Sequence, residues 1–557
     1  MNALVPIIIS FILMFLGYRF YSKYIADKVL CINDETPTPA VTYEDGMDYL
    51  PTHKSIVFNH HFASIAGLSP ILGPALAVIW GWVPVVAWLV IGSILLGAVH
   101  DFCALVLSVR NKGKSIGEVA DSVIGKRAKV LFLLIMFFAI ALAMGAFTKV
   151  VASLLQHGAD IGFKTYPAAS FPAGMLMIIA MICGVLMRKK ILGLLPVSII
   201  GTFLTFVCIW LGQYIPIYIR YDIWIYILLV YAFIASVLPV WLLLQPRDFI
   251  NAFALYIGMI LMYSAAIAFS PKIVAPAINP NPTLPSMIPL LFITVACGAI
   301  SGFHSLVASG TTAKQLAKES DARPVGYGAM LAEGALGIIA VMACCAGFAT
   351  QEEWLTHYAD WGAAKGLGPK LSVFVQGAAN FVSWLGIPLE LALTFVALIV
   401  VSFALTTLDS GTRILRYNTE ELMDTFHLSF LKNRFLSSAV AIAAIWFLAT
   451  QPIGKDLWLL FGTTNQLLAG LVLLTATVYL ISNKRNSLVT AIPMLAMLAI
   501  TLWALLLNLG SYISDERTTL IVVSSLILLI ALGIVIEVIL FFSKRNKQGP
   551  IEQDAQG

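Results

Sequence analysis

Charged side chains are scarce in this chain of 557 residues. Only 11% of the residues are Asp, Glu, Lys or Arg, whereas 60% are hydrophobic. About a quarter of the residues in a soluble domain are charged, so a chain with this composition cannot cover a water-exposed surface. Many segments reach the roughly 20 apolar residues that a helix needs to cross a bilayer, whereas transmembrane β-strands would give short alternating segments. The sequence therefore predicts an all-α polytopic membrane protein that is surrounded by the lipid bilayer.

Other signals are missing as well, and each absence excludes a class of function. The seven cysteines lie mostly inside apolar segments and form no C-x-x-C pair, so we interpret them as packing residues. The chain has no Walker A motif, which argues against transport driven by ATP. It has no basic tract with interleaved aromatic residues, so we expect no nucleic-acid partner. We also expect no enzymatic activity, no cofactor and no metal site.

The apolar segments predict about fifteen transmembrane helices. Cytoplasmic loops of membrane proteins are enriched in Lys and Arg. With the N-terminus outside and the C-terminus cytoplasmic, 26 of these residues fall in cytoplasmic connections, Arg247 among them, and seven fall in outer connections. The approximate limits of the spans are 3–25, 62–80, 83–108, 129–156, 168–187, 191–213, 223–245, 250–270, 286–309, 326–350, 387–408, 433–450, 457–480, 487–508 and 519–543.

One further apolar segment, 371–385, does not fit this alternation of the loops. It contains Gln376 and Asn380, and counting it as a span would place Arg413 and Arg416 outside. We interpret it as a re-entrant or interfacial hairpin on the outer face, which requires that the protein itself covers its irregular backbone.

Two spans carry helix breakers at matching places. The second contains Gly67, Pro70, Gly73 and Pro74, and the ninth contains Gly298 and Gly302, followed by Ser309-Gly310-Thr311-Thr312. These spans run in opposite directions, and paired broken helices of opposite direction are typical of transporters with an inverted repeat. Backbone N–H groups and small side chains at such breaks can bind a carboxylate. The predicted substrate-binding residues are Ser64, Gly67, Ser69, Gly73, Gly302, Ser305, Thr311 and Thr312.

Ionisable side chains inside the spans are candidates for proton or ion coupling, because charge in lipid is costly. Asp101, next to His100 in the third span, is the strongest, although an ion pair with Lys149 would also explain it. Glu333 lies near the cytoplasmic end of its span, where a helix-terminal contact explains it equally well. Asp409 closes the eleventh span, and its alternative role is an ion pair with Arg413.

Three histidines complete the set of coupling candidates. His60 and His61 lie at the inner mouth of the second span, and His304 lies deeper in the ninth. Histidine titrates near neutral pH, so these side chains can relay protons, although the adjacent pair can also be explained as interfacial polar residues. Asn465 and Gln466, in the thirteenth span, can line a site or form hydrogen bonds between helices.

Six ordered motifs resemble the carbon starvation protein A (CstA) family. They are "NHHFASIAGLSPILGP", "GAVHDF", "SGFHSLVASGTTAKQ", "YGAMLAEG", "TTLDSGTRILRY" and "LFGTTNQLLAG", and together they cover residues 59–471. The resemblance implies a multi-pass transporter of the inner membrane with a LeuT-like inverted repeat. It also implies uptake of pyruvate or of peptides under nutrient limitation, by proton symport.

The chain is therefore interpreted as a single transmembrane transporter domain, 1–557. Around the CstA-like core at 59–471 it has an extra N-terminal span within 1–30, two C-terminal spans within 487–543 and a cytoplasmic tail at 544–557.

The leading hypothesis is a secondary active transporter whose partners are a small-molecule substrate and a coupling proton or cation. A carboxylate such as pyruvate, an amino acid or a peptide would bind at the two breaks. One alternative is a membrane-integral redox protein in which His61, His100 and His304 ligate haem or a metal. Helix breakers beside two of these histidines argue against rigid ligation. The other alternative is a nutrient sensor without flux, which the lack of a soluble signalling domain disfavours.

Overall fold

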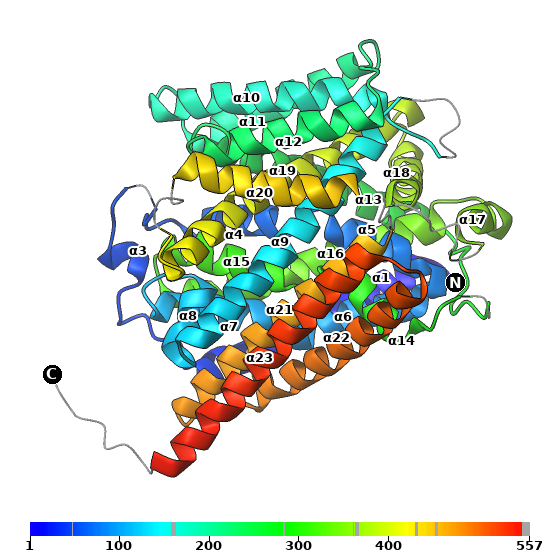
Figure 1. Ribbon diagram of the computed structural model, residues 1–557. Coiled ribbons are helices and arrows are strands. Elements are labelled where there is room, and N and C mark those ends of the chain that lie inside the picture. Colours follow the sequence, from blue (N-terminus) through cyan, green and yellow to red (C-terminus); the bar gives the residue numbers. More distant parts are fainter. Residues whose placement is uncertain are drawn as a thin grey trace.

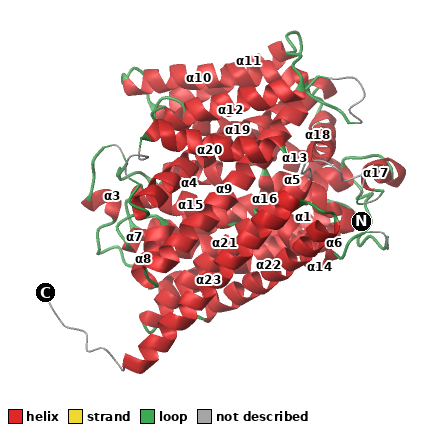
Figure 2. Ribbon diagram, viewed as in Figure 1, coloured by secondary structure: helices red, strands yellow, loops and turns green. Residues whose placement is uncertain are grey.

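A computed structural model describes the chain except residues 47, 158–162, 282–283, 360, 362–366, 429–432, 452–454 and 549–557. The described residues form helices and no strands, apart from two isolated bridges. Figure 1 shows most helices side by side with their axes roughly aligned, and Figure 2 shows the loops gathered at the two ends of this bundle. The prediction of an all-α protein is confirmed.

The helices follow one another along the whole chain. The first group is α1 (Leu4–Leu16), α2 (Ser22–Tyr24), α3 (Pro39–Thr42), α4 (Lys54–Ile65), α5 (Ser69–Ala77), α6 (Trp82–Gly92), α7 (Ala98–Arg110), α8 (Ile116–Val123) and α9 (Lys126–Leu155). The second group is α10 (Ser170–Arg188), α11 (Leu194–Gly212), α12 (Tyr221–Val237), α13 (Leu244–Phe269), α14 (Met287–Thr294), α15 (Gly302–Gly310) and α16 (Ala329–Ala346). The last group is α17 (Gln351–Tyr358), α18 (Leu367–Trp384), α19 (Leu389–Thr425), α20 (Arg434–Thr450), α21 (Lys455–Ser482), α22 (Leu488–Ser514) and α23 (Thr518–Gln548).

Eleven helices of the described residues are long and apolar enough to cross a membrane, and the bent pair α4–α5 makes up to twelve. The predicted spans at 223–245 and 433–450 form the shorter apolar helices α12 and α20. The predicted span at 286–309 is divided into α14 and α15. Every predicted segment therefore forms a helix or a broken pair, and the total of fifteen spans stays a prediction.

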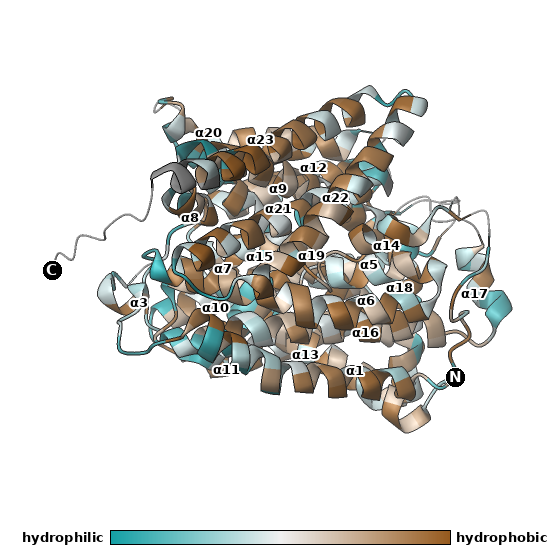
Figure 3. Ribbon diagram, turned by 90° about the horizontal axis from the view of Figure 1, so that it is seen from below, coloured by the Kyte–Doolittle hydropathy of each residue, from teal (hydrophilic) through white to brown (hydrophobic). Residues whose placement is uncertain are grey.

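The helices differ strongly in what surrounds them. α16, α19 and α21 are buried along almost their whole length, whereas α1, α11, α22 and α23 expose much of their surface. The exposed side chains on these outer helices include large apolar ones such as Phe203, Ile492 and Leu529. Figure 3 shows hydrophilic residues concentrated at the two ends of the bundle, for example around α3 and α17, with hydrophobic residues between them. This distribution fits a bilayer around the middle of the bundle.

Two predictions from the sequence are wrong. The segment 371–385 is no hairpin, because it belongs to the single helix α18, which packs against α16 and α19. One of its polar inserts has a protein partner within the bundle: Asn380 Nδ2 donates to the carbonyl oxygen of Gly347 at 2.7 Å. Arg247 does not lie in a cytoplasmic loop, because it is fully buried in the first turn of α13.

Candidate substrate and proton-coupling site

Both helix breaks that the sequence predicts are present, and they lie against each other. α4 ends at Ile65 and α5 begins at Ser69, with a bend of 46° between the two parts. α14 ends at Thr294 and α15 begins at Gly302. A Cβ atom on Gly73 would lie only 2.7 Å from the carbonyl oxygen of Thr294, so the two broken helices touch at a glycine.

Side chains of α21 satisfy backbone groups that the break between α14 and α15 leaves without helical partners. Asn465 Oδ1 accepts a hydrogen bond from the backbone N–H of Phe303 at 2.9 Å, which caps α15. Trp458 Nε1 donates to the carbonyl oxygen of Thr294 at 3.3 Å, and Gln466 Nε2 donates to that of Phe292 at 2.6 Å. Unpaired backbone groups are costly within a membrane, so these bonds stabilise the broken conformation. Asn465 and Gln466 therefore form the interhelical hydrogen bonds that their sequence context allowed.

Four ionisable side chains meet beside this break, and we call them the histidine–carboxylate cluster: His100, Asp101, His304 and Glu333. Asp101, on α7, has Oδ1 at 2.7 Å from His100 Nδ1 and Oδ2 at 2.8 Å from His304 Nδ1. His304 Nε2 lies 3.1 Å from Glu333 Oε2, which is an ion-pair distance without hydrogen-bond geometry. All four side chains are fully buried. The cluster joins α7, α15 and α16 through side chains that can all gain or lose a proton.

The chemistry of this cluster follows from its charges. Two carboxylates and two imidazoles carry no net charge when both imidazoles are protonated, and each lost proton adds a negative charge to a fully buried site. Buried charge is costly unless it is paired. The cluster can therefore hold and release protons, and each change alters the force between α15 and its neighbours α7 and α16.

His61 links the first broken helix to the segment that follows α15. Its Nδ1 lies 2.9 Å from Thr312 Oγ1, and both side chains are fully buried. His61 Nε2 has no hydrogen-bond partner among the described residues. The predicted residues His61 and Thr312 are thus brought together, whereas the neighbouring Thr311 is exposed and donates to the carbonyl oxygen of Val307 on its own helix.

A second group of charged residues lies between α12, α13 and α19, and we call it the arginine cluster: Tyr231, Arg247, Asp248 and Asp409. Arg247 Nη1 is paired with Asp409 Oδ2 and donates to Tyr231 Oη at 2.8 Å. Tyr231 Oη in turn donates to Asp409 Oδ2 at 2.6 Å. Arg247 Nη2 lies 3.4 Å from Asp248 Oδ1. At the edge of this cluster, His60 Nδ1 on α4 lies 3.7 Å from Asp248 Oδ2.

These contacts overturn three of the alternatives considered for the sequence. Asp409 pairs with Arg247, whereas Arg413 donates to the carbonyl oxygens of Ala235 and Leu238. Lys149 donates to the carbonyl oxygen of Gln451 and not to Asp101. Glu333 is deeply buried rather than placed at a helix end near solvent.

The remaining predicted substrate-binding residues serve mainly as packing and local hydrogen-bonding groups in this structure. Ser64 Oγ donates to the carbonyl oxygen of His60 at 2.8 Å, and Ser305 Oγ donates to that of Gly302 at 2.6 Å. Ser69 is buried at the start of α5. A Cβ atom added to Gly67 would lie 2.3 Å from Thr407 Oγ1. A Cβ atom added to Gly302 would lie 2.4 Å from the carbonyl oxygen of Asn465.

Residues 2–356 and 347–504 match the model of the family described as carbon starvation protein CstA. The chain belongs to this family. A relative named "Peptide transporter CstA", from Helicobacter pylori J99, is 35% identical over 92% of this chain and 83% of its own length. The protein of the same name from Bacillus subtilis 168 is 34% identical over 90% and 89%. The relative named "Pyruvate/proton symporter BtsT", from Escherichia coli K12, is 33% identical over 92% and 82%.

Among solved structures, the manganese transporter of Eremococcus coleocola in complex with an aromatic bis-isothiourea substituted compound aligns with 90% of this chain and 99% of its own. The identity is 11% and the TM-score is 0.47.

Membership of the CstA family, together with the apolar helices, identifies the chain as a multi-pass transporter of the membrane, which in bacteria is the inner membrane. The histidine–carboxylate cluster and the arginine cluster both lie within the residues that match the family model. Tyr231, Arg247 and Asp248 were not among the candidates from the sequence. The signal that could have found Arg247 and Asp248 is their charged pair in "LLLQPRDFINAF", which lies between two apolar runs.

Proposed function

We propose that this chain takes up a small carboxylate such as pyruvate, or peptides or amino acids, by proton symport under nutrient starvation. The observation that carries the proposal is the buried contact of Asp101 with His304, and of His304 with Glu333, across α7, α15 and α16. A chain of exchangeable protons that links one half of a broken helix to two neighbouring helices is suited to coupling proton binding to the movement of that half. The relatives named as peptide transporter and as pyruvate/proton symporter support the same class of substrate and the same driving ion.

In the proposed architecture, fifteen spans form a LeuT-like inverted repeat with the N-terminus outside and the C-terminus in the cytoplasm. α4–α5 and α14–α15 are the equivalent broken helices of the two repeats. The substrate binds near these breaks, with Ser69, Thr312 and the backbone around Gly67, Gly73 and Gly302 as the closest polar groups. Ser64, Ser305 and Thr311 would contribute only after leaving their present backbone partners.

Protonation of the cluster sets the order of events. With the cluster protonated, His304 is held between two carboxylates, so α15 stays fixed against α7 and α16. When the proton is lost on the cytoplasmic side, the buried carboxylates have no positive charge to pair with. This favours a rearrangement that lets water reach them. His60, His61 and Asp409, on the neighbouring elements, are the further proposed coupling residues. Each transport cycle then moves substrate and proton in the same direction.

The test is uptake of labelled pyruvate, alanine and dialanine by purified protein in liposomes, with and without an inward pH gradient. The gradient should drive accumulation of at least one of these compounds above its external concentration. Asp101→Asn and His304→Ala should abolish accumulation. Glu390→Gln is the matched control, because it changes an exposed carboxylate that lies 3.9 Å from Lys164. Accumulation at the wild-type level in both cluster variants would contradict the proposal.

A further inference from the structure

The arginine cluster is a built polar site that proton coupling alone does not explain. Its guanidinium and both carboxylates are fully buried, and they come from two helices, α13 and α19. A guanidinium cannot lose its proton in a protein, so Arg247 serves no relay. A permanent buried cation between two carboxylates is instead suited to holding anions.

The cluster is also incompletely satisfied. Three of its buried atoms have no hydrogen-bond partner among the described residues: Arg247 Nε, Asp248 Oδ2 and Asp409 Oδ1. Buried polar atoms without partners are costly, and native structures keep few of them. Asp409 already occupies one nitrogen of the guanidinium, whereas Arg247 Nε is an unused donor. A second anion can therefore compete with Asp409 for the same arginine.

The position of the cluster connects it to the broken helix α4–α5. Thr407 lies two residues before Asp409 on α19, and its side chain abuts Gly67 at the break. His60, near the end of α4, lies 3.7 Å from Asp248. The arginine cluster therefore lies against α4, the helix that leads into the break, although Thr407 and Asp409 point to different faces of α19.

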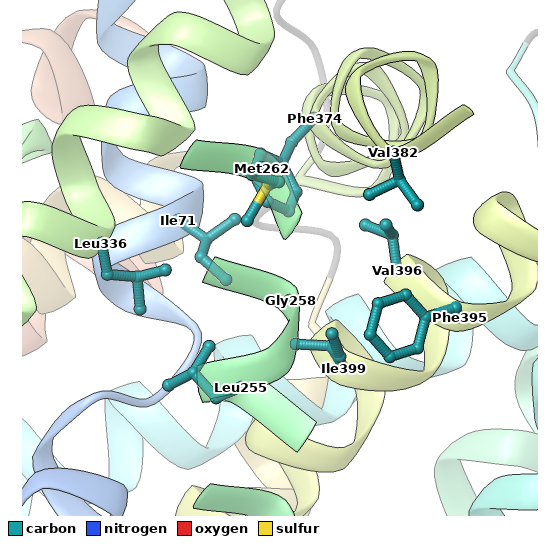
Figure 4. Close-up of a pocket in the computed structure, with 10 residues that line it drawn as sticks. All are labelled: Ile71, Leu255, Gly258, Met262, Leu336, Phe374, Val382, Phe395, Val396 and Ile399. Atoms are coloured by element: carbon teal, nitrogen blue, oxygen red, sulfur yellow. The ribbon is translucent and has the colours of Figure 1, made fainter. Parts of the chain in front are cut away.

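Two small cavities lie beside α13 and α19, and none of the four residues of the arginine cluster lines them. One is lined by Thr205, Asn251 and Ser402 together with apolar residues. The other is lined only by apolar side chains and Gly258 (Figure 4). Each has a volume of about 10 Å³, which is the space of one water molecule. The two cavities share Phe395 and Ile399. Asn251 is one helical turn beyond Arg247, so charged, polar and apolar surfaces follow one another along the same seam.

We propose that Arg247 binds the carboxylate of the transported substrate in exchange for Asp409, with the apolar part of the substrate against the seam between α13 and α19, which must widen to admit it. This inference rests on the proposed function and gives it a residue for substrate recognition. When the substrate carboxylate takes over Arg247, the released Asp409 needs a positive partner in the buried site. For pyruvate that partner is the coupling proton, received from the histidine–carboxylate cluster, and for a dipeptide it is the ammonium group of the peptide itself.

Binding measured without a gradient tests this directly. Purified protein in detergent at one fixed pH is titrated with pyruvate against pyruvamide, and with dialanine against alanyl-alaninamide. The wild-type protein should bind at least one carboxylate more tightly than its amide by roughly 30-fold or more, because truncating one side of a buried charge pair has at least that effect. Equal binding of carboxylate and amide, or binding of neither pair, would overturn the inference.

Arg247→Gln alone leaves two buried carboxylates without their cation and can fail to fold, so the test uses variants that keep the charge balance. The double variant Arg247→Gln/Asp409→Asn removes one charge of each sign and should bind carboxylate and amide within about threefold of each other. Arg247→Lys keeps the charge but loses the planar fork, and should retain an intermediate preference of about tenfold. Asp409→Asn removes the internal competitor and should bind the carboxylate about tenfold more tightly than the wild type at neutral pH.

Arg220→Gln is the matched control for the loss of a guanidinium, because Arg220 is exposed and pairs only with the exposed Asp222 among the described residues. An undiminished preference for the carboxylate in the double variant would overturn the inference. The two proposals can fail independently of each other. If the protein binds the carboxylate through Arg247 but the pH gradient drives no accumulation, symport is rejected and the binding site is kept. If the gradient drives accumulation but the protein does not prefer the carboxylate, the binding site is rejected and symport is kept.

Discussion

The two buried clusters differ in one property that separates their roles. Every charge of the histidine–carboxylate cluster depends on a proton, since it consists of two imidazoles and two carboxylates. The arginine cluster contains a fixed cation, with Arg247 between Asp248 and Asp409. A site without a fixed charge responds to pH, and a site with a buried guanidinium attracts anions. We therefore propose that proton coupling takes place at α7, α15 and α16, and that a carboxylate is recognised at α12, α13 and α19.

The largest effect on stability is expected at Arg247. Arg247→Gln leaves Asp248 and Asp409 buried without their cation, which should lower the free energy of unfolding by roughly 3–5 kcal/mol. Thermal unfolding of the detergent-solubilised protein measures this loss, and adding Asp409→Asn should restore a large part of it. An unchanged unfolding temperature in the single variant would show that the pair does not stabilise this state.

The largest effect on coupling is expected at Asp101. Asp101→Asn keeps the shape of the side chain but removes the charge between His100 and His304, so accumulation driven by a pH gradient should stop. Exchange of labelled for unlabelled substrate at equal pH should continue, because the arginine cluster is intact. Liposome uptake and counterflow assays on the same preparation measure the two activities, and loss of both together would argue against separate roles for the clusters.

A smaller effect is expected at Glu333, which contacts only one side of His304. Glu333→Gln should shift the dependence of uptake on external pH and reduce the rate by about tenfold, the range of a single charged hydrogen-bond partner. Uptake rates between pH 5 and pH 8 check this. A pH profile identical to that of the wild type would remove Glu333 from the coupling chain.

Asn465 tests the support of the broken helix rather than either cluster. Asn465→Ala removes the cap on the N–H of Phe303, which should destabilise the protein by about 1–3 kcal/mol as a lost buried hydrogen bond.

The smallest effect is expected for Arg127→Gln, since the pair of the exposed Arg127 with Glu537 contributes at most about 1 kcal/mol. Thermal unfolding of both variants gives the comparison, and an equal loss in the two would contradict this account of the break.

The sequence predicts the helical architecture well because apolar length and helix breakers are local signals. The breaks at Gly67 and Gly298 to Gly302 were visible as glycine and proline inside apolar runs. Asp101, His304 and Glu333 were each identified as candidates because charge inside a span is conspicuous. Their mutual contact was not predictable, since it depends on how three helices that are distant in sequence pack together.

Arg247 shows the limit of reading loops by charge. A basic residue near the end of a span counts as a loop residue under the positive-inside rule, and nothing local distinguishes it from a buried one. Its true partner, Asp409, lies 162 residues away, whereas Arg413 is four residues from Asp409 and was the obvious local candidate. The prediction for segment 371–385 failed for a related reason, because the partner of Asn380, the carbonyl oxygen of Gly347, is distant in sequence.

We propose that protons act at Asp101 while the substrate carboxylate binds at Arg247. The most direct test measures, for Asp101→Asn, the preference for pyruvate over pyruvamide and for dialanine over its amide, and the accumulation driven by an inward pH gradient. We expect that the preference for the carboxylate persists and that the accumulation is lost. Accumulation at the wild-type level would contradict the proposal, and so would the loss of both the preference and the accumulation.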